Sequence, residues 1–257
     1  MGRAGSNRVS YGGAAPRGNH RELFPDRMPM TTTPSWTITG LRAERADARL
    51  ELASPEAGVV LRESGDHLLG IDLAAPRRQP LAPCDFWVRG EDLVAVYEPA
   101  DPRQLRATAL WRRLPAAQPA WDLVISAQTS LLESDSRLAV VSDLVGGEIA
   151  WGRWEHGRVD WVPLAPGSPC PTEAQCLLIE RSGDAVVLAV HPADFRRIEL
   201  THEDRRLQIV CRLFPAEIEK GVLLRSRVRA AVGPPANPDW ASGIVGSLAT
   251  ESPPLTT

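Results

Sequence analysis

Hydrophobic and polar residues alternate through most of the chain between residues 36 and 233. This period of two is typical of β-strands that bury one face, because successive side chains on a strand point to opposite sides. Short clusters of turn residues separate the runs, as in a series of hairpins. The pattern predicts strands at residues 36–41, 48–53, 58–63, 67–73, 84–89, 92–98, 105–114, 121–128, 137–143, 148–155, 158–164, 175–181, 185–190, 195–200, 206–213 and 222–232.

Helical patterns are rare in the same region. Residues 215–220 predict one short helical turn, since a proline opens the segment and Gly221 follows it. Parallel strands need long crossover connections, which are usually helices, and the chain offers no such material. The sequence therefore predicts an all-β fold, a large antiparallel β-sandwich.

Both ends of the chain lack the alternating pattern. Residues 1–35 are rich in Gly, Pro, Arg, Ser and Thr, and this composition favours disorder because little apolar surface offsets the ordering entropy. Residues 234–257 contain several prolines and are expected to form a flexible tail. We thus expect one sandwich domain over residues 36–233. Because Met28 and Met30 closely precede the first strand, the natural protein either starts there or includes the upstream segment.

Two segments of the chain resemble each other. Residues 61–71 and 179–189 share a Ser-Gly-Asp turn between apolar runs, and each is followed by an acidic hairpin and then by a long strand. A duplication would give two related β units with a ligand cleft between them. Ser-Gly-Asp is also a favoured turn composition, so chance similarity accounts for the same pattern.

Two hairpins can be predicted residue by residue. A two-residue turn at residues 156–157 pairs Trp154 with Val159 and places both side chains in the core. In this register Trp151 falls on the opposite face, where it is available to a ligand. A second two-residue turn, at residues 90–91, joins the strands on its two sides in the same way.

Tryptophan is frequent, with eight residues against two tyrosines and four phenylalanines. Sugar-binding β-sandwiches use exposed tryptophans because the apolar face of a pyranose ring stacks on the indole. Tryptophans among apolar neighbours are more typical of a core, which leaves Trp151 and Trp240 as candidates for exposure. The tryptophans expected in the core are Trp36, Trp87, Trp111, Trp121, Trp154 and Trp161.

The last predicted strand carries Arg225, Arg227 and Arg229 on one face. Alternate residues on a strand lie about 7 Å apart, so the three guanidinium groups would form a row suited to an anionic ligand. The alternative is a solvated face in which the arginines pair with acidic neighbours such as Glu199, or Glu217 and Glu219. Together with Trp151, this row is the predicted ligand-binding surface.

Sequence motifs for common catalytic machineries are absent, including nucleotide-binding loops, zinc-binding patterns and the serine nucleophile elbow. We therefore expect no cofactor and no metal. Among the histidines, only His191 ends an apolar strand in a way that would position an imidazole, which makes it the candidate for a catalytic residue. An acid or base could also come from carboxylates within the predicted strands, namely Asp72, Asp85, Asp122, Glu148 and Asp160.

The net charge of −3 argues against a surface built for nucleic acid. No apolar run is long enough for a membrane helix, and the N-terminus lacks the apolar stretch of a secretory signal, so we expect a cytoplasmic protein. The cysteines show no metal-ligand spacing, and a disulfide between Cys170 and Cys176 is expected only in an exported protein. Exposed sheet edges would also allow a homo-oligomer.

The predicted strand content, the scarcity of helix and the Trp and Arg usage resemble the large β-sandwiches of the galactose mutarotase type. That resemblance implies a role with sugars, but those enzymes use two histidines and a glutamate, whereas only His191 is a candidate here. The sequence therefore favours a non-catalytic binding module for carbohydrate or another anionic ligand. The alternative is a mutarotase-like or epimerase-like enzyme that uses His191 and strand carboxylates.

Overall fold

The computed structural model describes residues 35–73, 82–98, 105–130, 132, 138–194, 196–214 and 220–252. Within these residues, eight strands form sheet A, in the spatial order β1 (Thr37–Thr39), β2 (Arg42–Glu44), β3 (Ala48–Glu51), β4 (Val59–Leu61), β5 (His67–Asp72), β10 (Ala139–Val145), β18 (Arg206–Arg212) and β17 (Arg197–Glu203). Nine strands form sheet B, in the order β14 (Val162–Pro163), β11 (Glu148–Gly152), β15 (Cys176–Glu180), β16 (Ala185–Val190), β19 (Leu223–Gly233), β9 (Ala120–Gln128), β8 (Arg106–Arg113), β7 (Asp92–Tyr97) and β6 (Asp85–Arg89). The same residues contain a small hairpin of β12 (Trp154–Glu155) and β13 (Arg158–Val159), a 3-10 turn η1 (Pro55–Ala57) and helix α1 (Pro238–Thr250).

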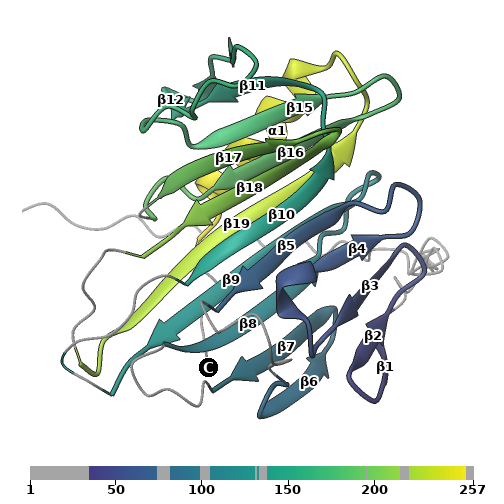
Figure 1. Ribbon diagram of the computed structural model, residues 1–257, viewed down its shortest axis with the longest axis vertical. Helices are drawn as coiled ribbons and strands as arrows, with labels where there is room; N and C mark the ends of the chain where they lie inside the picture. The colour runs from purple at the N-terminus through teal and green to yellow at the C-terminus, as the bar shows by residue number, and fades with distance from the viewer. Residues whose placement is uncertain are drawn as a thin grey trace, which may run out of the picture. The chain divides into compact units, whose positions relative to one another are not determined.

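The strands pair antiparallel, and the all-β sandwich predicted from the alternating pattern is confirmed (Figure 1). The registers of the two predicted hairpins are confirmed as well. Trp154 lies opposite Val159, and His156 in the turn between them has a φ of 53°, as a two-residue turn of this type requires. Trp87 lies opposite Val94 in the hairpin of β6 and β7.

The main core lies between the two sheets and is formed by alternate side chains of their strands. Trp111 and Trp121 are fully buried there, among aliphatic residues from both sheets. Two polar side chains of sheet B form hydrogen bonds across this core. The indole N–H of Trp111 donates to the carbonyl of Leu69 at 2.9 Å, and the Tyr97 hydroxyl donates to the carbonyl of Leu52 at 3.1 Å. These bonds join sheet B to sheet A and pair two donors that would otherwise be buried without a partner, whereas the indole N–H groups of Trp36 and Trp121 have no hydrogen-bond partner among the described residues.

Helix α1 contradicts the prediction of a flexible tail for this part of the C-terminal segment. Asn237 caps the helix by accepting the backbone N–H of Trp240 at 2.9 Å, and Pro238 starts the first turn, where a missing N–H costs nothing. Ala241 and Val245 lie one helical turn apart and are buried. The prolines that suggested a tail therefore mark the start of a helix.

Helix α1 packs on the outer face of sheet B, against β16 and β19, and covers a second, smaller core (Figure 1). Val187 and Ala189 of β16 contribute to this core, together with Val245 from the helix. Trp240, which the sequence suggested as exposed, packs against it. One half of sheet B is thus buried on both faces.

Several sequence predictions concern residues outside the described ranges. Residues 1–34, which cover almost all of the predicted disordered segment, and residues 215–219 of the predicted helical turn lie outside them. The two similar Ser-Gly-Asp segments form the β4–β5 and β15–β16 hairpins, which belong to different sheets. The long strands that follow differ in pairing, since β8 pairs with β7 whereas β19 pairs with β16. No helix among the described residues is long and apolar enough to cross a membrane.

Candidate functional site

A row of alternating charges crosses the outer face of sheet B. Asp92, Arg112, Asp122 and Arg229 lie directly opposite one another on β7, β8, β9 and β19. Side chains that are opposite each other on neighbouring strands point to the same face, so four strands contribute one charge each. We call these four residues the charged row.

The charged row contains two bidentate ion pairs of the same geometry. Arg112 donates through Nε and Nη2 to the two carboxylate oxygens of Asp92, at 2.6 and 2.8 Å. Arg229 donates in the same way to Asp122, at 2.6 and 2.8 Å. Hydrogen bonding to Asp92 raises the pKa of Arg112, with smaller contributions from the charges of Asp122 and Glu251. The guanidinium of Arg112 therefore stays charged at any physiological pH.

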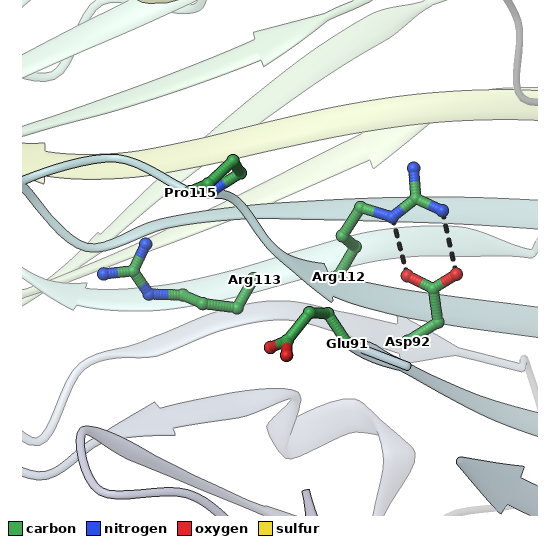
Figure 2. Close-up of a pocket in the computed structure, with 5 residues that line it drawn as sticks. All are labelled: Glu91, Asp92, Arg112, Arg113 and Pro115. Carbon is green, nitrogen blue, oxygen red and sulfur yellow. Dashed lines mark hydrogen bonds and ion pairs between the residues drawn. The ribbon is translucent and has the colours of Figure 1, made fainter. Parts of the chain in front are cut away.

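A surface hollow of about 300 Å³ lies at one end of the charged row. Figure 2 shows the Arg112–Asp92 pair on one side of this hollow, with Glu91 and Arg113 on the other side. Pro115 completes the lining. One guanidinium nitrogen of Arg112 points away from Asp92. The Arg112 side chain is half-buried, whereas Asp92 is buried, so the pair presents a guanidinium donor to the hollow.

A buried stack supports the far side of the hollow. Arg45 lies over the rings of Trp36 and Trp121, with its Cζ 5.7 and 5.6 Å from the two ring centroids. Nη1 of Arg45 donates to Glu91 at 2.8 Å. Arg113 also lies over the Trp121 ring, with its Cζ 5.7 Å from the centroid. Cation–π contacts of this kind hold a buried guanidinium in one orientation, which fixes Glu91 at the rim.

Trp87 lies on the same outer face of sheet B as Asp92 and Arg112. Its neighbours on β6, Phe86 and Val88, pack against the main core, so Trp87 points away from it. The side chain is 41% exposed, whereas the other tryptophans are buried or half-buried. The sequence placed Trp87 in the core because its neighbours are apolar, and that prediction is wrong. The hairpin register makes Trp87 a diagonal neighbour of Asp92, at about 7 to 8 Å between their Cα atoms.

The three arginines of β19 share one face, as the alternation predicts, but they do not form an open row. Arg227 and Arg229 are only 7% and 1% exposed, because the end of α1 lies over them. Arg225 is half-buried and donates to Ser126 Oγ at 3.2 Å. The partners of Arg229 are Asp122 and Glu251, and neither was among the acidic neighbours expected from the sequence.

His191 lies beside this buried arginine pair. Its backbone N–H donates to the carbonyl of Arg227 at 3.0 Å, and its Nδ1 accepts the backbone N–H of Ala193 at 3.2 Å. Burial and the charge of Arg227 lower the pKa of His191 to about 4, although Glu251 opposes the shift. The carboxylate of Asp194 lies 4.0 Å from Nδ1 and also accepts the backbone N–H of Arg227 at 2.7 Å.

The structure does not bring Trp151 to the arginines. Trp151 is half-buried and packs against the main core between the sheets, whereas Arg229 lies on the outer face of sheet B. Of the strand carboxylates, Asp122 is the partner of Arg229, and Asp160 pairs with Arg158 on the surface. No group of three or more His, Cys, Asp and Glu side chains in the described part of the chain is arranged to hold a metal ion.

No protein-family model and no curated protein matches this sequence. Among solved structures, the chain has a distant similarity to the crystal structure of a heparan sulfate lyase HepC mutant from Pedobacter heparinus. The two share 10% sequence identity with a TM-score of 0.33, over 70% of this chain and 28% of the lyase. This chain thus spans little more than a quarter of that protein, and its own residues have to indicate its function.

Proposed function

We propose that this protein is a non-catalytic carbohydrate-binding module whose contact surface is formed by Trp87 and Arg112, with the buried Asp92 holding the Arg112 guanidinium in place. The observation that carries the proposal is the exposed indole of Trp87 on the same face of sheet B as the bidentate Asp92–Arg112 pair. The hollow of about 300 Å³ begins at this pair.

The chemistry of a sugar fits both parts of this surface. The C–H face of a pyranose ring is apolar and stacks on an indole, which must therefore be exposed and rigidly held. Sugar hydroxyls both donate and accept hydrogen bonds, so they match a hollow lined by the Arg112 guanidinium, which donates, and by the Glu91 carboxylate, which accepts. Because Asp92 and Arg112 hold each other in place, little side-chain entropy is lost when a ligand binds.

The charges at this surface favour binding over catalysis. A general acid or base needs a pKa near the working pH, whereas Arg112 has a pKa raised above its already high usual value. The hollow is open to solvent, which suits the side of an extended glycan better than a small substrate enclosed on all sides.

A glycan array followed by isothermal titration of the best ligand tests the proposal. We expect the wild type to bind at least one saccharide class, and Trp87→Ala to lower the affinity at least tenfold by removing the stacking platform. Leu223→Ala is the matched control, because Leu223 is another large, exposed apolar residue of sheet B and lies on a different part of it.

Two outcomes would contradict the proposal. One is the absence of saccharide binding by the wild type at millimolar concentrations. The other is equal affinity of Trp87→Ala and Leu223→Ala for the ligand. If Trp151→Ala instead abolished binding while Trp87→Ala did not, the contact surface would lie near the half-buried Trp151 of β11 and not at Trp87.

A further inference from the structure

The C-terminal end of α1 closes over the buried arginines of β19 through Glu251. The carboxylate of Glu251 accepts from Nη2 of Arg229 at 2.8 Å, and its backbone carbonyl accepts from Nη1 of Arg227 at 3.2 Å. Ser247 Oγ, one turn earlier in the helix, accepts from Nη1 of Arg229 at 2.7 Å. The helix end therefore supplies the remaining acceptors of a guanidinium that Asp122 already holds on its other side.

Exposure is very unequal within this group. The side chain of Arg229 is 1% exposed and that of Asp122 is 13% exposed, whereas the side chain of Glu251 is 50% exposed. The guanidinium is thus fixed and desolvated, while its third partner lies at the surface. A group that replaced the Glu251 carboxylate from solvent would meet a guanidinium already oriented for it.

Charge balance makes Glu251 the exchangeable partner. Three guanidinium groups (Arg196, Arg227, Arg229) and three carboxylates (Asp122, Asp194, Glu251) interact in this region, and the neighbouring Arg112–Asp92 pair adds one charge of each sign. The group is therefore neutral only with Glu251 in place. His191 adds no charge near pH 7, because burial and Arg227 lower its pKa to about 4. Without Glu251 a positive charge would remain in a desolvated site, which costs free energy unless another anion is bound.

The docking of α1 does not depend on Glu251. Ala241, Val245 and Leu248 are buried in the smaller core, and Trp154 contacts the helix at Gly246. Glu251 follows the last helical residue, Thr250, and has an extended backbone conformation. Its side chain can therefore leave Arg229 while the helix stays in place.

We propose that Arg227 and Arg229 form an oxyanion site in which the Glu251 carboxylate is the resident counterion, and that a sulfate or phosphate group binds there when Glu251 turns out to solvent. The Nε–Nη2 edge of Arg229 stays bound to Asp122, so an oxyanion that replaces the Glu251 carboxylate accepts a charge-assisted hydrogen bond from Nη2. The site is separate from Trp87 and does not depend on the proposed carbohydrate function.

Isothermal titration and thermal unfolding with sodium sulfate, compared with sodium chloride at equal ionic strength, test the site. Glu251→Ala should bind sulfate at least tenfold more tightly than the wild type, because no internal carboxylate competes. Its melting temperature should rise more with sulfate than that of the wild type. Glu251→Gln, which keeps the volume and removes the charge, should show a smaller gain in the same direction.

Glu155→Ala is the matched control, since the Glu155 side chain is 52% exposed and pairs with Arg153, which is itself exposed. Sulfate stabilises many proteins by exclusion from their surface, and this general effect should be equal in both variants. The proposal is overturned if Glu251→Ala and Glu155→Ala respond alike, or if neither Glu251 variant binds sulfate more tightly than the wild type.

A sulfated monosaccharide, glucose 6-sulfate, distinguishes the source of the oxyanion. If Glu251→Ala binds this ester more tightly than inorganic sulfate, the site serves a sulfated or phosphorylated sugar. If inorganic sulfate binds more tightly, the site serves a free anion. Both results support the site, and loss of both relative to the wild type contradicts it.

Discussion

At the scale of single residues, burial and hydrogen bonding determine which of the groups predicted from the sequence are available for chemistry. His191 was selected because it ends an apolar strand, and it is brought next to Arg227 of the predicted arginine row. Its side chain is nevertheless buried, and its Nδ1 is occupied by the N–H of Ala193. With a pKa of about 4 the imidazole stays neutral at pH 7, so it is poorly matched to proton transfer there.

The lowered pKa of His191 predicts a pH dependence of stability. An unfolded chain binds a proton to this histidine below about pH 6.5, whereas the folded protein binds it only near pH 4. The unfolded state therefore binds more protons between these values, and the free energy of unfolding should fall as the pH drops from about 6.5 to 4. The loss is at most about 3 kcal/mol. Urea denaturation of the wild type and His191→Gln at pH 4.5 and 7 measures it.

The charged neighbours of His191 do not prevent this test. Arg227 opposes protonation, while Glu251 favours it, and both remain in the His191→Gln variant. The pH dependence of the variant therefore reports every other group, and the difference from the wild type reports His191. His202→Gln, which replaces an exposed histidine near the end of β17, is the control. Equal pH dependence of the wild type and His191→Gln would contradict the prediction.

At the scale of elements, local chemistry specified the hairpins but not the helix. The turn residues at 156–157 and 90–91 fix the loop length, and the loop length fixes the register, so the pairing of Trp154 with Val159 could be predicted. Helix α1 was missed because the prolines of this segment were interpreted as the mark of a flexible tail. The sequence did contain the signal, since Asn237 and Pro238 are a capping residue and a first-turn proline ahead of apolar residues at helical spacing.

The cap of α1 predicts a specific loss of stability. Asn237→Ala removes the acceptor for the Trp240 N–H and should lower the free energy of unfolding by about 1 kcal/mol. Asn237→Asp retains a side-chain oxygen and adds a negative charge at the positive end of the helix, so it should retain or slightly increase stability. Urea denaturation of both variants measures the difference. A loss of the same size in both would show that the cap does not stabilise the fold.

At the scale of the whole sandwich, the sequence could predict which side chains share a face but not which face is covered. The alternation placed Arg225, Arg227 and Arg229 together correctly. Helix α1, near the end of the chain, covers two of these arginines. This cover depends on contacts between segments that are distant in sequence. The same reason explains Trp87, which has apolar neighbours along the chain but lies on the outer side of sheet B. The charged row was missed because it exists only across four paired strands.

The charged row predicts a contrast between buried and exposed ion pairs in the same protein. Asp122→Asn removes the bidentate carboxylate from Arg229, whose side chain is 1% exposed, and should cost about 3 kcal/mol because a desolvated charge loses its main partner. Asp160→Asn breaks the pair with Arg158, whose side chains are 76% and 74% exposed, and should cost less than about 1 kcal/mol. Urea denaturation at low and high salt measures both.

Replacing the buried pair by Asp122→Leu with Arg229→Met should recover much of the loss, since two apolar side chains leave no unpaired charge. Equal losses in the two single variants would mean that solvent reaches Arg229 and that the row contributes little to joining the strands of sheet B.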